Sequence, residues 1–290
     1  MRGIVDLITE FIKDMLTSWV TSNLTNMFND VNDKVGQVAV EVGKTPSTWN
    51  SSIFTMVRNI SDTVMVPIAG MIISAILCYE LITMIMDKNN MHDFDTSLFI
   101  RYLGKACIAV MLLSKTFDIT MAIFDVGNHI VINAAGAINA TATIDVEATL
   151  LSMFTNQLSG MSMGELFGLG LETMIVSFGM KIMSAVITVI IFGRMIEIYL
   201  YISVAPVPFS TLGNREWGSI GTNYIKALIA LAFQGFFLMV CVGIYSALVA
   251  SLSVAGNIHS ALWTIVAYTV VLCFSMGKTS SLSRSIMHAH

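Results

Sequence analysis

Residues 193–234 read GRMIEIYLYISVAPVPFSTLGNREWGSIGTNYIKALIALAFQ, two apolar runs joined by a short polar segment. Pro206 and Pro208 should end the first run, because proline lacks the backbone donor that a helix needs and disfavours helical backbone before it. Arg194 and Glu197 lie three residues apart inside the apolar sequence. The stretch therefore predicts two long apolar helices that meet at a corner containing prolines.

The composition of the whole chain is that of a membrane protein. Of its 290 residues, 55% are hydrophobic and only 12% are charged, whereas soluble domains have about 25% charged residues. The net charge of -4 and the lack of a dense basic run argue against a nucleic-acid-binding surface. We therefore expect an all-α, polytopic integral membrane protein.

The residue types that carry chemistry are scattered. The four cysteines lie in apolar segments without a CxxC pair, so we expect buried apolar side chains rather than disulfides or a metal site. No phosphate-binding glycine loop, paired-carboxylate motif or zinc-protease motif is present, and the histidines are dispersed. The sequence predicts no catalytic, cofactor-binding or metal-binding residues, and hence a protein that is not an enzyme.

The N-terminal part is expected to form amphipathic helices rather than a span. Over residues 3–20 apolar side chains recur at helical spacing, and charged residues occupy the other side. The charges are too many for a bilayer crossing, so this helix should lie on a membrane surface or against a partner. Thr45 and Pro46 then indicate a helix cap followed by a first-turn proline.

Five segments are predicted to cross a bilayer core of about 30 Å. The second is the least regular, because Lys105 and Lys115 bracket its apolar run, and whether 98–139 crosses once or twice stays open. Lys115 is placed to pair with Asp118 at a spacing of three residues. The expected spans are 64–86, roughly 98–124 with a helical extension through 139, 171–204, 225–252 and 258–276.

The basic residues near the spans predict an orientation. They flank the first short loop, the proline corner and the C-terminal tail, whereas 140–170 and 253–257 have none, so the positive-inside rule places the N-terminus outside and the C-terminus in the cytoplasm. Arg58 is the exception. The expected regions are an extracellular amphipathic helical region (1–63), the first two spans with their extension (64–139), an extracellular acidic helical loop (140–170), a three-span core with the cytoplasmic corner (171–277) and a cytoplasmic tail (278–290).

A stripe of polar residues follows one face of the third span. A lysine inside a span is tolerated only against protein or water, which singles out Lys181. The stripe either lines a pore or makes hydrogen bonds between helices of a bundle or oligomer, a common role of Ser and Thr in membranes. Its members are Thr173, Ser177, Lys181, Ser184 and Thr188.

Two further sets are candidates for structural roles. Arg194 and Glu197 are expected to pair with each other or to reach the interface rather than to translocate ions. The helix-packing set on the fourth span consists of the small residues Gly243, Ala247 and Ser251, whose spacing of four permits close helix approach. The candidate corner comprises Arg194, Glu197, Pro206, Pro208, Arg215 and Trp217.

The corner resembles the polytopic inner-membrane channel subunit of type IV secretion systems, the TrbL/VirB-six-like conjugal transfer proteins, in the form found on conjugative elements of Gram-positive bacteria. The specific match covers about 193–250, and elsewhere only the layout of helices agrees. The residues that carry the resemblance are Arg194-Met195-Ile196-Glu197 with Tyr199, Ala205-Pro206-Val207-Pro208-Phe209-Ser210, and Asn214-Arg215-Glu216-Trp217 followed by the span at 224–237.

The resemblance implies a non-enzymatic subunit of a mating channel. Such a subunit would form a ring-shaped oligomer in the cytoplasmic membrane and help to pass a relaxase-bound single DNA strand, with cytoplasmic ATPases and outer stalk proteins as partners. The alternative is a small-solute or ion transporter that uses the Lys181 stripe and Arg194 with Glu197, although no internal repeat is detectable. A holin-like pore is a third interpretation.

Overall fold

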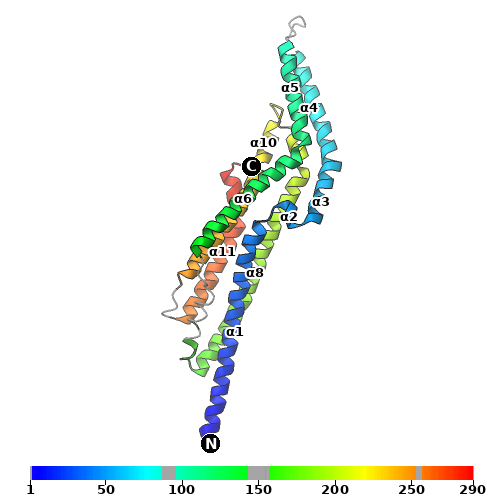
Figure 1. Ribbon diagram of the computed structural model, residues 1–290. Helices are drawn as coiled ribbons and strands as arrows, with labels where there is room; N and C mark the ends of the chain where they lie inside the picture. Colours follow the sequence, from blue (N-terminus) through cyan, green and yellow to red (C-terminus); the bar gives the residue numbers. More distant parts are fainter. Residues whose placement is uncertain (1, 87–95, 143–153, 155–156, 253–256, 290) are drawn as a thin grey trace. The chain divides into compact units, whose positions relative to one another are not determined.

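In the computed structural model, residues 2–86, 96–142, 154, 157–252 and 257–289 are described, and every regular element among them is a helix. This confirms the all-α prediction. The elements are α1 (Arg2–Val42), α2 (Pro46–Trp49), α3 (Ser51–Ile60), the π-helical turn η1 (Ser61–Met65), α4 (Val66–Met86), α5 (Thr96–Ser114), α6 (Thr116–Ala142), α8 (Met163–Val204), α9 (Pro206–Ser210), α10 (Gly218–Ala250) and α11 (Ile258–Ile286) (Figure 1).

Five helical stretches of the described chain are long and apolar enough to cross a membrane, as predicted. The first begins earlier than expected, because α3, η1 and α4 follow one another without interruption. The third and fourth also extend beyond their expected N-terminal ends, and the fifth beyond its expected C-terminal end. The stretches are Ser51–Met86, Thr116–Ile138, Met163–Val204, Gly218–Ala250 and Ile258–Ile286.

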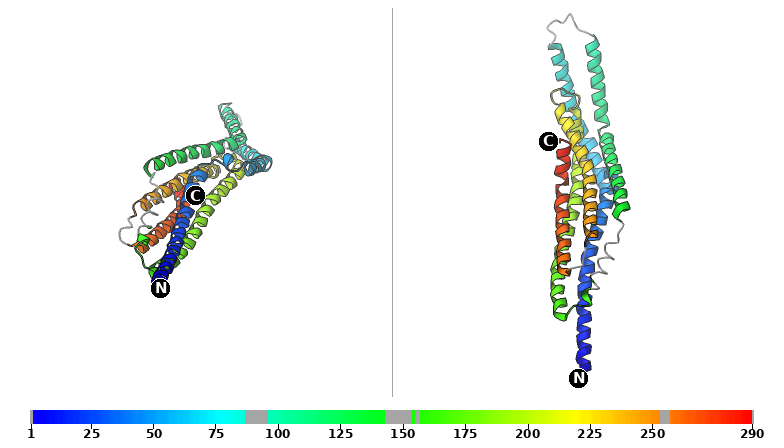
Figure 2. Two further views of the ribbon diagram at one scale, coloured as in Figure 1. Left: turned by 60° about the horizontal axis from the view of Figure 1, so that its bottom comes forward. Right: turned by 90° about the vertical axis from the view of Figure 1, so that its left-hand side faces the viewer.

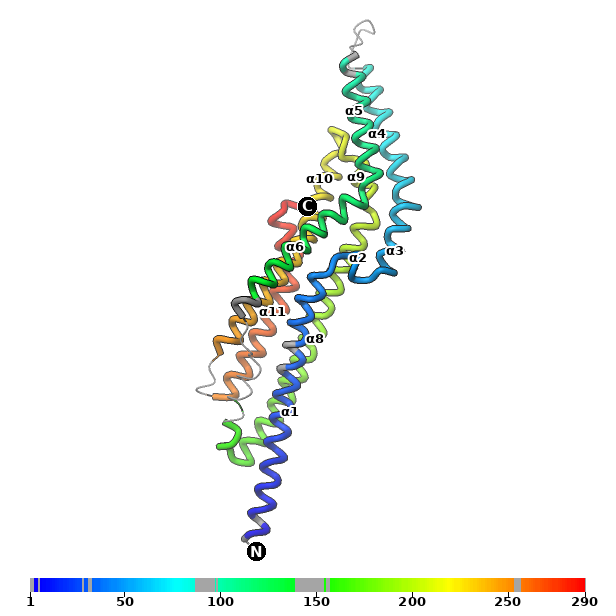
Figure 3. Tube along the Cα trace, in the orientation of Figure 1, coloured from blue at the N-terminus to red at the C-terminus, as the bar shows by residue number. Residues whose placement is uncertain are grey.

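The second candidate span lies further along the chain than the expected 98–124, and the expectation of one uninterrupted helix through this segment was wrong. The structure divides that segment at Lys115 into α5 and α6, and within 98–139 only Thr116–Ile138 qualifies as a span among the described residues. The Thr116 hydroxyl donates to the carbonyls of Leu112 (3.0 Å) and Leu113 (2.9 Å), a type of bond that bends helices. The change of direction between α5 and α6 is visible in Figure 3.

The expected local contact next to this bend is present. Lys115 and Asp118 form an ion pair with an N–O distance of 3.2 Å, and both side chains are exposed. The predicted cap at Thr45 is also present, because its side chain and backbone both bond within the first turn of α2. Both features depend only on neighbouring residues, which explains why the sequence predicted them.

The described residues form two compact units, and each unit is assembled from separate stretches of the chain. The first unit contains residues 1–42, 132–192 and 237–279. The second contains 43–131, 193–236 and 280–290. Helices α6, α8, α10 and α11 contribute residues to both units.

In the first unit, α1 and the N-terminal part of α8 lie side by side (Figure 1, Figure 2). The Trp19 and Phe167 rings are 6.5 Å apart between centroids, and the Asn23 amide donates to the Thr173 hydroxyl at 3.3 Å. Residue numbers rise together along both helices, so they run parallel. The buried face of α1 contains Val20, Leu24 and Met27.

The first turns of α1 have a different surface. Their large apolar side chains are exposed, which agrees with the expected amphipathic helix at 3–20 but leaves its contact with a membrane or a partner as a prediction. The exposed residues are Ile4, Leu7, Ile8, Phe11 and Met15.

The second unit has its main core where α8 ends and α10 begins. The Tyr199 hydroxyl donates to the Pro46 carbonyl at 2.7 Å, and the Trp49 ring lies 5.8 Å from the Tyr199 ring, which ties α2 to α8. A smaller core joins α4 and α5. The buried residues of the main core are Val57, Phe117, Phe124, Met195, Ile198, Tyr199, Ile202, Ala205, Phe209, Tyr224, Leu228, Leu231 and Ala232.

Replacing Gly127 by alanine should destabilise the packing of α6 on α10 in this unit. An ideal Cβ at Gly127 would lie 2.7 Å from the Cβ and 3.1 Å from the carbonyl oxygen of Ala232. Because backbone atoms must move to relieve this clash, we expect a cost of about 1–3 kcal/mol. Thermal unfolding of the purified protein in detergent measures the effect.

Gly136→Ala on the same helix is the matched control. The described structure has no neighbouring atom within 4 Å of its ideal Cβ position, so alanine should be neutral or mildly stabilising there through its helix propensity. An unfolding midpoint for Gly127→Ala equal to that of Gly136→Ala would contradict the close contact.

Candidate functional site

The predicted corner between the two apolar runs is formed by α9 and the turn after it. Helix α8 ends at Val204, as the prolines predicted. Pro206 begins α9 and Pro208 lies in its first turn, where the backbone donors that prolines lack would have no helical partner. The Thr211 hydroxyl donates to the Pro208 carbonyl (2.8 Å) and accepts from the Gly221 amide (3.1 Å), so the corner is closed by hydrogen bonds.

Asn214 connects this corner to α4. Its side-chain oxygen accepts from the backbone amides of Glu216 (2.7 Å) and Trp217 (2.9 Å), as a cap before α10. Its amide nitrogen donates to Glu80 Oε1 at 3.0 Å. The Asn214 side chain is buried, so its oxygen and its nitrogen both have protein partners in place of water.

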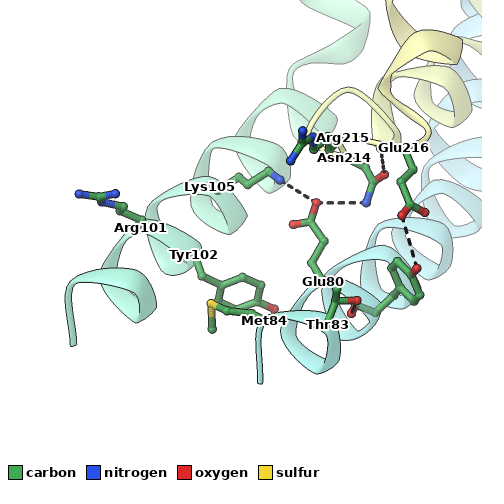
Figure 4. Close-up of a pocket in the computed structure, with 10 residues that line it drawn as sticks. Glu80, Thr83, Met84, Arg101, Tyr102, Lys105, Asn214, Arg215 and Glu216 are labelled. Carbon is green, nitrogen blue, oxygen red and sulfur yellow. Dashed lines mark hydrogen bonds and ion pairs between the residues drawn. The ribbon is translucent and has the colours of Figure 1, made fainter. Parts of the chain in front are cut away.

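Glu80 is the centre of the polar cluster at this corner (Figure 4). Lys105 Nζ from α5 lies 2.6 Å from Glu80 Oε1, the same oxygen that accepts from Asn214. Only 17% of the Glu80 side chain is exposed. Because one carboxylate receives both bonds, Glu80 joins α4, α5 and the corner.

Aromatic residues extend the cluster. The Tyr79 and Trp217 rings are stacked with centroids 6.3 Å apart, and the Tyr79 hydroxyl lies 3.5 Å from Glu216 Oε1. The Tyr102 hydroxyl donates to the Leu77 carbonyl at 3.0 Å. Burial raises the pKa of Tyr102, and nearby Cys78 and Glu80 add to the shift. The Tyr102 hydroxyl is therefore neutral at physiological pH and keeps its donor hydrogen.

A cavity of about 730 Å³ opens beside this cluster. Its basic lining residues are Arg101 and Lys105 of α5 and Arg215 of the corner, which flank the first loop and the corner in the sequence. The full lining is Tyr79, Glu80, Thr83, Met84, Arg101, Tyr102, Lys105, Asn214, Arg215 and Glu216.

Arg194 and Glu197 do not form the pair that was expected. Glu197 forms its ion pair with Arg284 of α11, and the Arg284 guanidinium lies 5.5 Å from the centroid of the Tyr201 ring. Arg194 is 6% exposed, and its Nη2 lies 3.5 Å from the Leu231 carbonyl of α10. Positions three apart turn toward different neighbouring helices here, so tertiary contacts replace the local pair.

The polar stripe of the third span is divided between two roles. Thr173 is buried and accepts from Asn23 of α1, an interhelical bond of the kind expected. Ser184 is buried as well, and the Thr188 hydroxyl donates to its carbonyl at 3.0 Å within the helix. Of these three residues, Thr173 therefore contacts another helix, whereas the Thr188 bond lies within α8.

Ser177 and Lys181 instead face a surface cavity of about 460 Å³ between α8 and α1. Asn23 and Asn26 of α1 line the same cavity. Lys181 is exposed, and among the described residues its ammonium group has no hydrogen-bond or ion-pair partner. A pore-lining role for these two residues stays a prediction.

The helix-packing set on α10 is only partly engaged within the chain. An ideal Cβ at Gly243 would lie 3.1 Å from Ile138, so α6 approaches α10 closely at this point. Ala247 and Ser251 are exposed, and the Ser251 hydroxyl donates to the Leu248 carbonyl at 2.7 Å. Any contact of these two with another helix remains a prediction.

The first unit contains a polar cluster that was not predicted from the sequence. Glu172 of α8 contacts His259 Nδ1 of α11 and accepts from Trp263 Nε1 at 2.8 Å. The position of Glu172 next to the start of an apolar run could have indicated that its carboxylate needs polar partners.

The cysteine prediction was also partly wrong, because Cys78 and Cys107 are exposed, although Cys273 is buried.

Within the described part of the chain, no group of three or more His, Cys, Asp or Glu side chains could hold a metal ion.

Comparison with protein families matches residues 31–206 to the family described as TrbL/VirB6 plasmid conjugal transfer like protein. This match covers more than half of the chain but overlaps the expected 193–250 stretch only as far as Pro206. No curated protein and no solved structure matches the chain.

Glu80→Gln should destabilise the second unit, because the carboxylate accepts two bonds in a nearly buried position. We expect a loss of about 1–2 kcal/mol in the free energy of unfolding. Asp118→Asn is the control, since the pair it breaks is exposed on both sides and such pairs contribute little. Thermal unfolding in the same detergent compares them, and equal midpoints would exclude a structural role for the Glu80 cluster.

Proposed function

The chain belongs to the TrbL/VirB6 plasmid conjugal transfer-like family, and from this we propose that it is a channel subunit of a type IV secretion machine. Membership makes it a component of the conjugal transfer machinery, and its five apolar helices make it a multi-pass membrane protein. The family match over residues 31–206 is the observation that carries the proposal. The subunit would be non-enzymatic and would help to pass relaxase-bound single-stranded DNA across the cytoplasmic membrane.

The proposed orientation has the corner in the cytoplasm and the N-terminal end of α1 outside. The gathering of Arg101, Lys105 and Arg215 around one cavity supports it, because basic residues are retained on the cytoplasmic side. Arg58, the residue that argued against this orientation, is paired with Asp62 at 3.7 Å and lies 5.1 Å from the Phe117 ring centroid. Its charge is therefore partly compensated within the protein.

The proposed strand path uses the exposed polar part of α8. Lys181 and Ser177 line a cavity with Asn23 and Asn26, and Lys181 has a free charge among the described groups. In a ring of subunits each copy would contribute one such lysine, and cations attract the phosphates of a passing strand. The outer regions 3–20 and 140–170 would form a vestibule next to stalk proteins, whereas the corner would face the cytoplasmic ATPases.

Lys181→Gln should lower the frequency of DNA transfer in a mating assay, by about tenfold or more if a ring of such charges attracts the strand. The double variant Pro206→Ala/Pro208→Ala should lower it too, because the corner loses the residues that end α8. Lys278→Gln is the matched control, as it removes an exposed lysine outside the stripe. Immunoblots of membranes establish that each variant is present at the normal level.

The transporter interpretation predicts the opposite pattern. Uptake of a small solute or ion would then be abolished by these substitutions while DNA transfer continued at the level of the Lys278→Gln control. That result would refute the channel-subunit proposal.

The orientation predicts that a cysteine at Gln157 is labelled from outside intact cells by a membrane-impermeant maleimide. The background should carry serine at the four native cysteine positions, since two of these are exposed. A cysteine at Ser285, in the C-terminal segment, should react only after permeabilisation. Labelling in the reverse order would overturn the orientation.

A further inference from the structure

One face of α5 changes from basic to apolar along its length. Arg101 and Lys105 are one turn apart, and Ile108 and Leu112 continue the same face at spacings of three and four. All four residues line a groove of about 480 Å³, to which the corner contributes Leu212 among others. Arg101 and Lys105 also line the larger polar cavity, so the groove and the cavity meet at these two residues.

The charges at this junction are only partly compensated. Lys105 is held by Glu80, and Glu216 Oε1 lies 3.5 Å from the Tyr79 hydroxyl. Figure 4 shows the Glu216 carboxylate directed away from Arg215. Arg101 and Arg215 are both exposed, and among the described residues neither guanidinium has a hydrogen-bond or ion-pair partner. The polar end of the site therefore offers two free cationic groups that suit an anion.

The surface beside the groove is largely apolar. Gly104 has no neighbouring atom of the described structure within 4 Å of its ideal Cβ position, which leaves the groove open between its basic and apolar ends. The outer side of α5 exposes large apolar side chains that water would solvate poorly. These are Ile100, Leu103, Ile108, Val110 and Met111.

We propose that this junction binds one anionic phospholipid. The phosphate lies against Arg101 and Arg215, and an acyl chain follows the groove along Ile108 and Leu112. Basic pockets beside membrane helices select acidic headgroups in this way. The site depends on the membrane location of the chain and not on DNA passage, so it stands or falls independently of the proposed channel function.

Native mass spectrometry of the full-length protein in detergent tests the proposal, with dioleoyl phosphatidylglycerol and dioleoyl phosphatidylcholine as matched probes. We expect phosphatidylglycerol to bind more tightly, and Arg101→Gln/Arg215→Gln to weaken its binding about 30-fold, since each basic residue contributes about one kcal/mol to an acidic lipid. Arg58→Gln is the matched control, because this exposed arginine already has a carboxylate partner, and it should retain the preference. Equal binding of the two lipids, or an unchanged double variant, would overturn the proposal.

A second variant separates a lipid from a free anion. Gly104→Leu places a side chain into the groove without changing any charge, and leucine is well tolerated in helices. It should weaken phosphatidylglycerol binding while the elution volume and unfolding midpoint of the lipid-free protein stay normal. If instead Gly104→Leu has no effect and soluble glycerol phosphate or an acidic peptide displaces the lipid at equal concentration, the site binds a soluble anion and the proposal is wrong.

Discussion

The interior of a bilayer has no water to bond the peptide backbone, and the rest of this structure depends on that constraint. Helices meet it because they pair their own amides and carbonyls, and all regular elements of the described chain are helical. Hydroxyl side chains within or beside the spans follow the same rule. Thr120, Thr188 and Thr269 each donate to the carbonyl four residues earlier, so a polar side chain is satisfied without a second helix.

Three carboxylates near the ends of apolar helices instead have their partners on other helices. Glu80 joins α4, α5 and the corner, Glu197 joins α8 to α11 through Arg284, and Glu172 joins the same two helices within the first unit. Each partner lies far away in the sequence. A carboxylate near the end of an apolar span thus ties its helix to a second helix. Leaving the carboxylate unpaired would cost more free energy than ordering its own side chain and that of its partner.

The second span shows where prediction of helix boundaries from the local sequence fails. The expected 98–124 segment contained an apolar run between lysines, and only the bend at Lys115 and Thr116 shows that α5 and α6 are separate helices. The family match likewise lies mostly N-terminal to the corner on which the resemblance was based.

By itself, the sequence determined the helical class, the count of five apolar spans, the end of α8 before Pro206, the cap at Thr45 and the pair of Lys115 with Asp118. These features depend on composition, periodicity and contacts within one turn. Only the tertiary structure decided that Glu197 pairs with Arg284, that Arg194 turns inward, and that Arg101 and Arg215 line one cavity. The physical reason is that partner choice depends on which helix faces lie together, and that is set by the packing of distant segments rather than by any local pattern.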